Sequence, residues 1–201
     1  SYQLDVVSLA GSGDYTVTLT LNATVEAEGI VPLASNDTRA TAQGLNDSRV
    51  VLESGASHVA VVGQSTGNDD FYSFSLTAGQ SATLVASALS SGAVQIELFD
   101  TSGTPLAKGV ADGSRRAERI GDFRSPATGT YYARVSGDAG LRYSLVVTGA
   151  AGFEQEPNFN ELSARSVGSA GEVLGSLGRR GGGASRVAVV NTAQGGDTAG
   201  F

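Results

Sequence analysis

The sequence lacks cysteine, methionine and tryptophan altogether, and its 201 residues include one histidine and four prolines. Without cysteine the chain forms no disulfide and offers no thiolate to a metal ion, which is in line with a secreted bacterial protein that folds without redox support. The absence of methionine, even at the start, fits a processed chain, a fragment of a longer protein or a trimmed segment. These absences restrict the chemistry of the chain to oxygen and nitrogen groups.

Basic residues are also scarce, since 13 Lys and Arg stand against 20 Asp and Glu, for a net charge of −7. Proteins that bind the phosphate backbone of nucleic acids depend on clustered Lys and Arg, so a nucleic-acid partner is not expected. No apolar run reaches the length of a membrane span, and no signal peptide is present at the N-terminus. We therefore expect neither a membrane span nor a nucleic-acid partner.

Glycine is abundant, with 28 residues, and Ser, Thr and Val are frequent, which is typical of a turn-rich all-β protein. Apolar and polar residues alternate with the period of a half-buried strand in several segments. The clearest segments are 15–21, 72–76, 94–98, 131–135 and 143–147, and weaker ones are 49–52, 58–62 and 82–88. Short strands without helical periodicity predict an antiparallel β-sandwich with jelly-roll-like connectivity.

A sequence repeat divides the chain. The segment GASHVAVV at 55–62 returns as GASRVAVV at 183–190, and Tyr15 and Tyr143 lie in similar strands at the same spacing of 128 residues. This spacing is too long for solenoid units and suits whole domains in tandem. We expect the C-terminal strands of one copy at 1–33, a complete sandwich at 34–150 and the N-terminal part of a third copy at 151–201.

Ordered motifs in the middle copy carry a resemblance to a known family. They are Asn36-Asp37-Thr38, NDDFYSF at 68–74, AGQ at 78–80, LFD at 98–100, GTYYARV at 129–135 and YSL at 143–145. Their order and spacing resemble the bacterial pre-peptidase C-terminal domain. The resemblance implies a noncatalytic β-sandwich attached to secreted proteases and other exported proteins, which in some members binds calcium and in collagenases binds collagen.

The resemblance also suggests ligands for calcium in the middle copy, because calcium prefers carboxylate, amide and carbonyl oxygens. The candidates there are Asn36, Asp37, Asn68 and Asp70. This set is incomplete, since the sequence places Pro32 and Ala34 where the family has two glutamates, and Asn68 where it has the first loop aspartate. The alternative is that these residues form turns by bonding to their own backbone.

The third copy carries a second candidate set, Glu154, Glu156 and Asn158. Phe159 follows where the family has an aspartate, and the loop at 195–198 holds one carboxylate, so this set is incomplete too. Turn formation and metal binding are equally open for it.

Catalysis is not expected. The one histidine, His58, follows Ser57 in an apolar strand, and adjacent side chains of a strand point to opposite faces, so they form no nucleophile and base pair. Alternation places Tyr72, Tyr131 and Tyr143 on the core side, whereas Tyr132 and Arg134 face outward together. Tyr132 and Arg134 are therefore the candidate surface contact.

We expect a noncatalytic accessory module of an extracellular or cell-surface bacterial protein, acting as spacer, adhesion or substrate-targeting domain. Its expected partners are an extracellular polymer or neighbouring domains of the same protein, with calcium as the candidate cofactor. The alternative is a structural subunit of an extracellular fibre or surface layer that self-assembles by exchanging strands between chains.

Overall fold

The computed structural model describes residues 7, 9–14, 20, 22–28, 30–31, 34–52, 55–111, 117–153, 172–177 and 186–191. The elements in chain order are β1 (Thr24–Val25), η1 (Arg39–Thr41), β2 (Gln43–Gly44), η2 (Asn46–Ser48), β3 (Val50–Val51), β4 (Ser57–Gln64), β5 (Asp70–Leu76), β6 (Ser81–Ala88), β7 (Val94–Phe99), β8 (Pro105–Lys108), β9 (Val110–Ala111), β10 (Ala117–Arg124), β11 (Gly129–Gly137), β12 (Arg142–Gly149), β13 (Gly152–Phe153), β14 (Glu172–Leu177) and β15 (Arg186–Asn191). Within these residues the helical segments are the short 3₁₀ turns η1 and η2, and no helix is long and apolar enough to cross a membrane.

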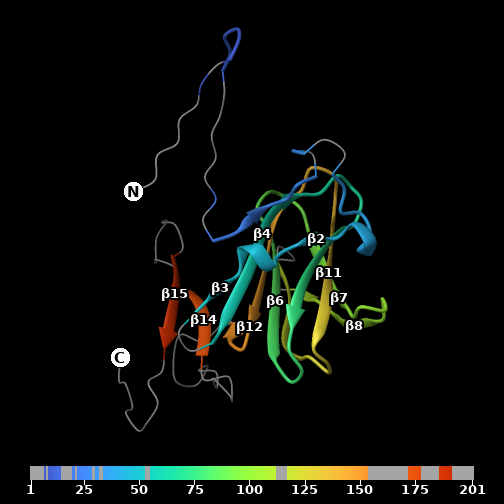
Figure 1. Cartoon of the computed structure of the whole chain (residues 1–201), viewed down its shortest axis with the longest axis vertical. Helices are drawn as coiled ribbons and strands as arrows, with labels where there is room; N and C mark the ends of the chain where they lie inside the picture. The colour runs from blue at the N-terminus through green and yellow to red at the C-terminus, as the bar shows by residue number, and fades with distance from the viewer. Residues whose placement is uncertain are drawn as a thin grey trace.

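Two sheets form a β-sandwich (Figure 1). Sheet A has the strand order β1-β4-β12-β6-β10-β9, with β3 beside β4, and sheet B has the order β2-β5-β11-β7-β8. The chain crosses from one sheet to the other between β4, β5, β6 and β7, and again between β10, β11 and β12, which is jelly-roll-like connectivity. The predicted antiparallel sandwich is confirmed, and within its two sheets the structure adds two short parallel pairings, β1 with β4 and β2 with β5.

The core lies between the two sheets and follows from strict alternation along the strands. In β5 and β7 every second side chain is buried, and the same pattern runs through β11 and β12. The largest fully buried side chains are Tyr72, Tyr143, Phe74, Leu45, Leu84, Ile96, Leu98 and Leu145. Tyr72, Tyr131 and Tyr143 all lie in this core, as the alternation predicts.

Strand β10 is a full strand of sheet A that the periodicity does not reveal. Only Ile120 is buried among its eight residues, and the register shifts between Ile120 and Phe123. Asp122 takes a φ of 57° inside this irregularity, a left-handed conformation that interrupts the two-residue period. Tertiary pairing with β6 therefore forms the strand without an alternating apolar pattern.

Both copies of the repeated sequence form strands, since 58–63 belongs to β4 and 186–191 is β15. β4 pairs antiparallel with β3, and β15 pairs antiparallel with β14. The tandem arrangement stays a prediction, and most of the strand expected at 15–21 lies outside the described residues. Because β1 joins sheet A, the chain already contacts this sandwich ten residues before the expected boundary at 34.

Replacing Leu84 by Ala tests the position of the core. Leu84 is 0% exposed on β6, so the cavity should lower the free energy of unfolding by about 2 to 5 kcal/mol. Val110→Ala is the control, because Val110 is 75% exposed on the edge strand β9 and should cost less than about 1 kcal/mol. Chemical denaturation measures both values. Equal losses would contradict the assignment of the core.

Candidate cation site

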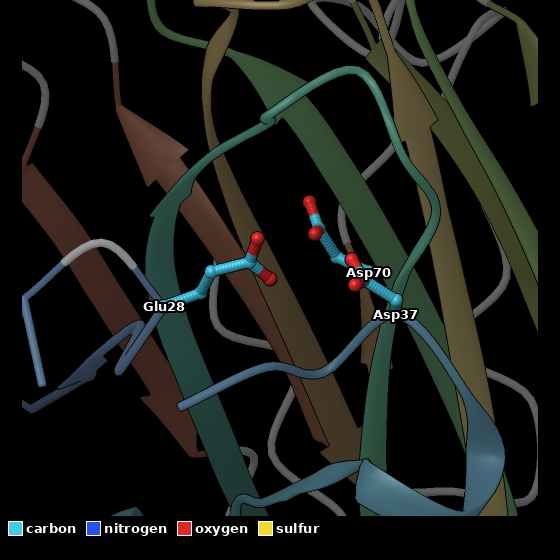
Figure 2. A group of neighbouring side chains, drawn as sticks. All are labelled: Glu28, Asp37 and Asp70. Carbon is cyan, nitrogen blue, oxygen red and sulfur yellow. The ribbon is translucent and has the colours of Figure 1, made fainter. Parts of the chain in front are cut away.

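Three carboxylates from separate parts of the chain meet at one end of the sandwich. Asp70 is the first residue of β5, Asp37 precedes η1, and Glu28 follows β1. Their oxygen atoms lie within 4.8 Å of one another. Figure 2 shows Glu28 reaching toward Asp37 and Asp70 from the opposite side of a shared space. We call these three residues the acidic cluster, and residues 24–28 and 34–37 the entering segment.

Glu26 fixes the entering segment to the sandwich. This buried carboxylate accepts hydrogen bonds from the hydroxyl of Tyr72 at 2.6 Å, the hydroxyl of Tyr143 at 3.0 Å and the side-chain amide of Asn36 at 3.1 Å. The backbone N–H of Gln64 donates a fourth, at 2.7 Å. Because both oxygens of Glu26 already accept hydrogen bonds, this residue fixes the positions of its neighbours.

The tyrosine pair connects Glu26 to the acidic cluster. The Tyr72 and Tyr143 hydroxyls form a very short hydrogen bond with each other, and the Tyr143 hydroxyl also lies 2.7 Å from Asp70 Oδ2. Because each hydroxyl has one proton, Glu26, Asp70 and the two tyrosines share these protons in one hydrogen-bond network. Burial, together with the nearby carboxylates, raises the pKa of both tyrosines far above the usual range, so both remain protonated donors.

Glycine at position 63 makes this packing possible. A Cβ added to Gly63 would lie 2.8 Å from Glu26 Oε2 and 2.8 Å from the Tyr143 ring. Neither neighbour is free to move away, because each is held by the hydrogen bonds described above. The close approach of the entering segment to β4 therefore depends on the absence of a side chain here.

The acidic cluster and the neighbouring Asn36 contain buried oxygens that lack hydrogen-bond partners. These are the Oδ1 atoms of Asn36, Asp37 and Asp70, and Asn36 and Asp70 are only 2% and 1% exposed. A buried acceptor without a partner costs about 1 to 3 kcal/mol, and more when it is charged. The orphaned oxygens belong to neighbouring residues at one end of the sandwich, where Asp37 and Asp70 also face Glu28.

The electrostatics of the acidic cluster are also unfavourable unless its negative charge is partly neutralised. Burial raises the pKa of Asp70 to about 7; the hydrogen bond from Tyr143 opposes this, and the carboxylates of Glu26, Glu28 and Asp37 add to it. Like charges crowded in a poorly solvated place are unfavourable unless a proton or a cation neutralises them. The site is therefore arranged to take up positive charge.

Among the residues chosen from the sequence, Asn36, Asp37 and Asp70 are brought together here. Asn68 is exposed in the turn before β5, outside this group. Glu154, Glu156 and Asn158 lie outside the described residues, so their proposed role stays a prediction.

Sequence reasoning missed Glu26 and Glu28. They form the Glu-x-Glu pair that the resemblance leads one to expect, but seven residues separate Glu28 from Asn36. Reading the family spacing without an insertion placed Pro32 and Ala34 at the glutamate positions. An Asn-Asp pair preceded by Glu-x-Glu at a variable distance was the signal that could have found them.

The outward surface of sheet B holds the predicted contact residues. Arg39 lies over the Tyr132 ring at 5.8 Å, and Arg134 lies over the Phe99 ring at 5.6 Å. Arg134 also forms ion pairs with Asp69, at 3.1 Å, and with Glu97. The positive charge of Arg134 is thus already balanced by these two carboxylates. Its guanidinium is therefore less available for an ionic contact with a partner than the sequence predicts.

Ser57 and His58 do not form a catalytic pair. Ser57 is buried and accepts a hydrogen bond from Arg49 at 3.1 Å, whereas His58 is half-exposed on the other face of β4. Burial lowers the pKa of His58, and a hydrogen bond with the backbone of Asn22 opposes that shift. The two residues therefore have separate structural surroundings.

The raised pKa of Asp70 predicts a specific pH dependence when cations are chelated. Folded Asp70 keeps its proton up to about pH 7, whereas an unfolded aspartate loses it near pH 4, so the folded state binds more protons between these values. The free energy of unfolding should therefore fall as the pH rises from about 4 to 7. Asp70→Asn should remove this decline, measured by denaturation of both proteins in EDTA. Parallel curves would contradict the assigned pKa.

The chain is similar to known proteins in part of its length. No curated protein matches the chain. The pre-peptidase C-terminal domain of a collagenase from Bacillus anthracis is similar in structure, with 20% identity, a TM-score of 0.37, and coverage of 44% of this chain and 86% of that one. The periplasmic inhibitor of g-type lysozyme from Aeromonas hydrophila gives 20% identity, a TM-score of 0.37, and coverage of 50% and 92%. In sequence, residues 68–137, from the turn before β5 to the end of β11, match the family model of the bacterial pre-peptidase C-terminal domain.

Proposed function

We propose that this sandwich is a noncatalytic accessory module of an exported bacterial protein, and that one calcium ion stiffens the segment by which the chain enters it. Three buried oxygens without hydrogen-bond partners, on Asn36, Asp37 and Asp70, carry the calcium part of this proposal. The family match over residues 68–137 supports the accessory role, because such domains accompany secreted proteins.

The residues present fit calcium. The group offers only oxygen donors, which hard cations prefer, and it includes no histidine or cysteine. Glu28, Asp37 and Asp70 would hold the ion, with the side-chain oxygen of Asn36 as a further neutral ligand. Calcium commonly takes six to eight oxygens, so backbone carbonyls and water would complete the set. When bound, the ion would supply the positive charge that the three carboxylates lack.

The mechanical consequence follows from where the ligands lie. Glu28 belongs to the entering segment, whereas Asp70 begins β5 in sheet B. An ion bound by both residues would hold the incoming polypeptide in one fixed direction relative to the sandwich. This would add to the rigidity that the Glu26 hydrogen bonds already provide. The module would then act as a calcium-dependent spacer between its neighbours, and as a rigid support for adhesion or substrate targeting.

The outward surface of sheet B is the proposed contact with an extracellular polymer. Phe71 and Phe99 lie 6.2 Å apart between ring centroids, beside Tyr132 and Arg134. Because Arg134 is neutralised by Asp69 and Glu97, contact would depend chiefly on the aromatic rings.

The alternative of a self-assembling fibre or surface layer rests on an open edge. β9 ends sheet A, and its Val110 is largely exposed, which leaves an edge that another strand could extend. Size-exclusion chromatography with light scattering at micromolar concentration measures the mass directly. A single monomeric species would exclude assembly, and a concentration-dependent series of oligomers would favour it over the spacer.

A few millimolar calcium should raise the melting temperature by several degrees above the value in excess chelator, since a ligand that binds only the folded state stabilises it. The double variant Glu28→Gln, Asp37→Asn should lose the rise. Asp47→Asn is the matched control, because Asp47 lies in η2, outside the cluster, and it should respond like the wild type. Glu154→Ala with Glu156→Ala should also keep the rise.

Terbium provides an independent readout of the same site. The chain has no tryptophan, so sensitised terbium emission must come from tyrosine, and Tyr143 contacts Asp70 directly. We expect emission that calcium displaces and that the Glu28→Gln, Asp37→Asn variant lacks. Calcium without effect on melting, together with no terbium emission, would rule the site out; loss of the response in the Glu154 and Glu156 variant would assign it to the third copy.

A further inference from the structure

A cavity of about 600 Å³ opens at the end of the sandwich opposite the acidic cluster. Its lining comes from η2, β3, the start of β4, the end of β5 and the start of β11. Asp70 and Leu76 mark the two ends of β5, one at each site, so about 20 Å of strand separates them. The cavity is thus independent of the acidic cluster, and its volume suits one small ligand.

Arg49 is the charged residue among the described residues of the lining, and hydrogen bonds hold it in place. Its guanidinium donates to Ser57 Oγ at 3.1 Å, to Asn46 Oδ1 at 2.8 Å and to the backbone oxygen of Ser75 at 3.1 Å. A guanidinium has five N–H donors, so two remain for a ligand. An arginine fixed in this way loses little conformational entropy when it binds an anion.

No carboxylate pairs with Arg49 in the part of the chain that the structure describes. The ion pairs found there all involve Arg134 or Lys108, on sheet B. Among the described residues that line the cavity there is neither aspartate nor glutamate. In a chain of net charge −7 this is a local positive site, and its missing partner would be a carboxylate brought by a ligand.

The rest of the lining consists mainly of neutral hydrogen-bonding groups. The hydroxyl and amide side chains are Asn46, Ser57, Ser75, Thr77, Gln80, Thr128 and Thr130, against two apolar side chains, Val51 and Leu76. A pocket that binds a peptide side chain is lined mainly by apolar groups. A pocket that binds a sugar ring needs many hydrogen-bond donors and acceptors for the hydroxyls of the ring. This composition favours a sugar over a peptide.

We propose that this cavity binds an acidic saccharide residue of the uronic acid class. Its carboxylate would bind Arg49, and its hydroxyls would bond to the Thr and Gln side chains of the rim. This goes beyond the calcium-stiffened spacer of the preceding subsection, and it assigns a second, chemically distinct site to the same module.

The test is a titration of the ¹⁵N-labelled chain with sodium glucuronate, followed by two-dimensional NMR, with sodium acetate and glucose as separate probes. We expect shifts confined to the cavity residues, and binding of glucuronate at least tenfold tighter than that of either probe. Arg49→Gln should weaken binding at least tenfold, with Arg142→Gln, at an exposed arginine away from this cavity, as the unchanged control. Calcium should not be required.

Thr130→Val keeps the test informative if Arg49→Gln disturbs the fold, because it replaces one rim hydroxyl with a methyl group on a side chain that is only partly buried. It should weaken glucuronate binding several-fold and leave the remaining spectrum intact. Acetate that binds as tightly as glucuronate would reduce the site to a general anion site and overturn the saccharide assignment. Equal binding of glucose, or no shifts at all, would overturn the role of Arg49.

Discussion

The hydrogen bonds to the buried Glu26 carboxylate connect sheet A, sheet B and the entering segment, which together form the proposed site. Tyr72 comes from sheet B, Tyr143 and Gln64 come from sheet A, and Asn36 comes from the entering segment. One side chain therefore joins both sheets and the incoming chain. Removal of its carboxylate would leave several buried donors without partners, which is among the more costly changes that a small domain experiences.

This arrangement lowers the stability of the ion-free fold at the acidic cluster. Burial beside Glu26 leaves Asp70 with a raised pKa and an unpartnered oxygen, so the ion-free fold is less stable than its packing permits. A ligand that brings the missing positive charge would offset this loss of stability. The far cavity has the opposite character, because a fixed arginine there lacks an anionic partner among the described residues. The two ends of the sandwich are thus complementary to ligands of opposite sign.

Periodicity predicted the sandwich because half-buried strands such as β5 and β7 alternate strictly, and a tyrosine on the apolar side of a strand enters the core. It missed β10, whose pairing depends on neighbours and whose period is broken at Asp122. It identified Asn36, Asp37 and Asp70, which are close to recognisable motifs. It missed Glu26 and Glu28, because seven residues separate Glu28 from Asn36 in the sequence, and the pairing of β1 with β4 is not visible there. The pairing of residues distant in sequence is what a single sequence does not display.

The most direct test of the account is calorimetric titration with calcium at pH 6.5 in two buffers of different ionisation enthalpy. If the ion replaces the proton of Asp70, whose pKa is about 7, binding must release roughly three quarters of a proton at this pH, and almost none at pH 8.5. One calcium per chain with this release would establish the coupling of the buried carboxylates to the ion. Absence of binding, or binding without proton release at pH 6.5, would contradict it.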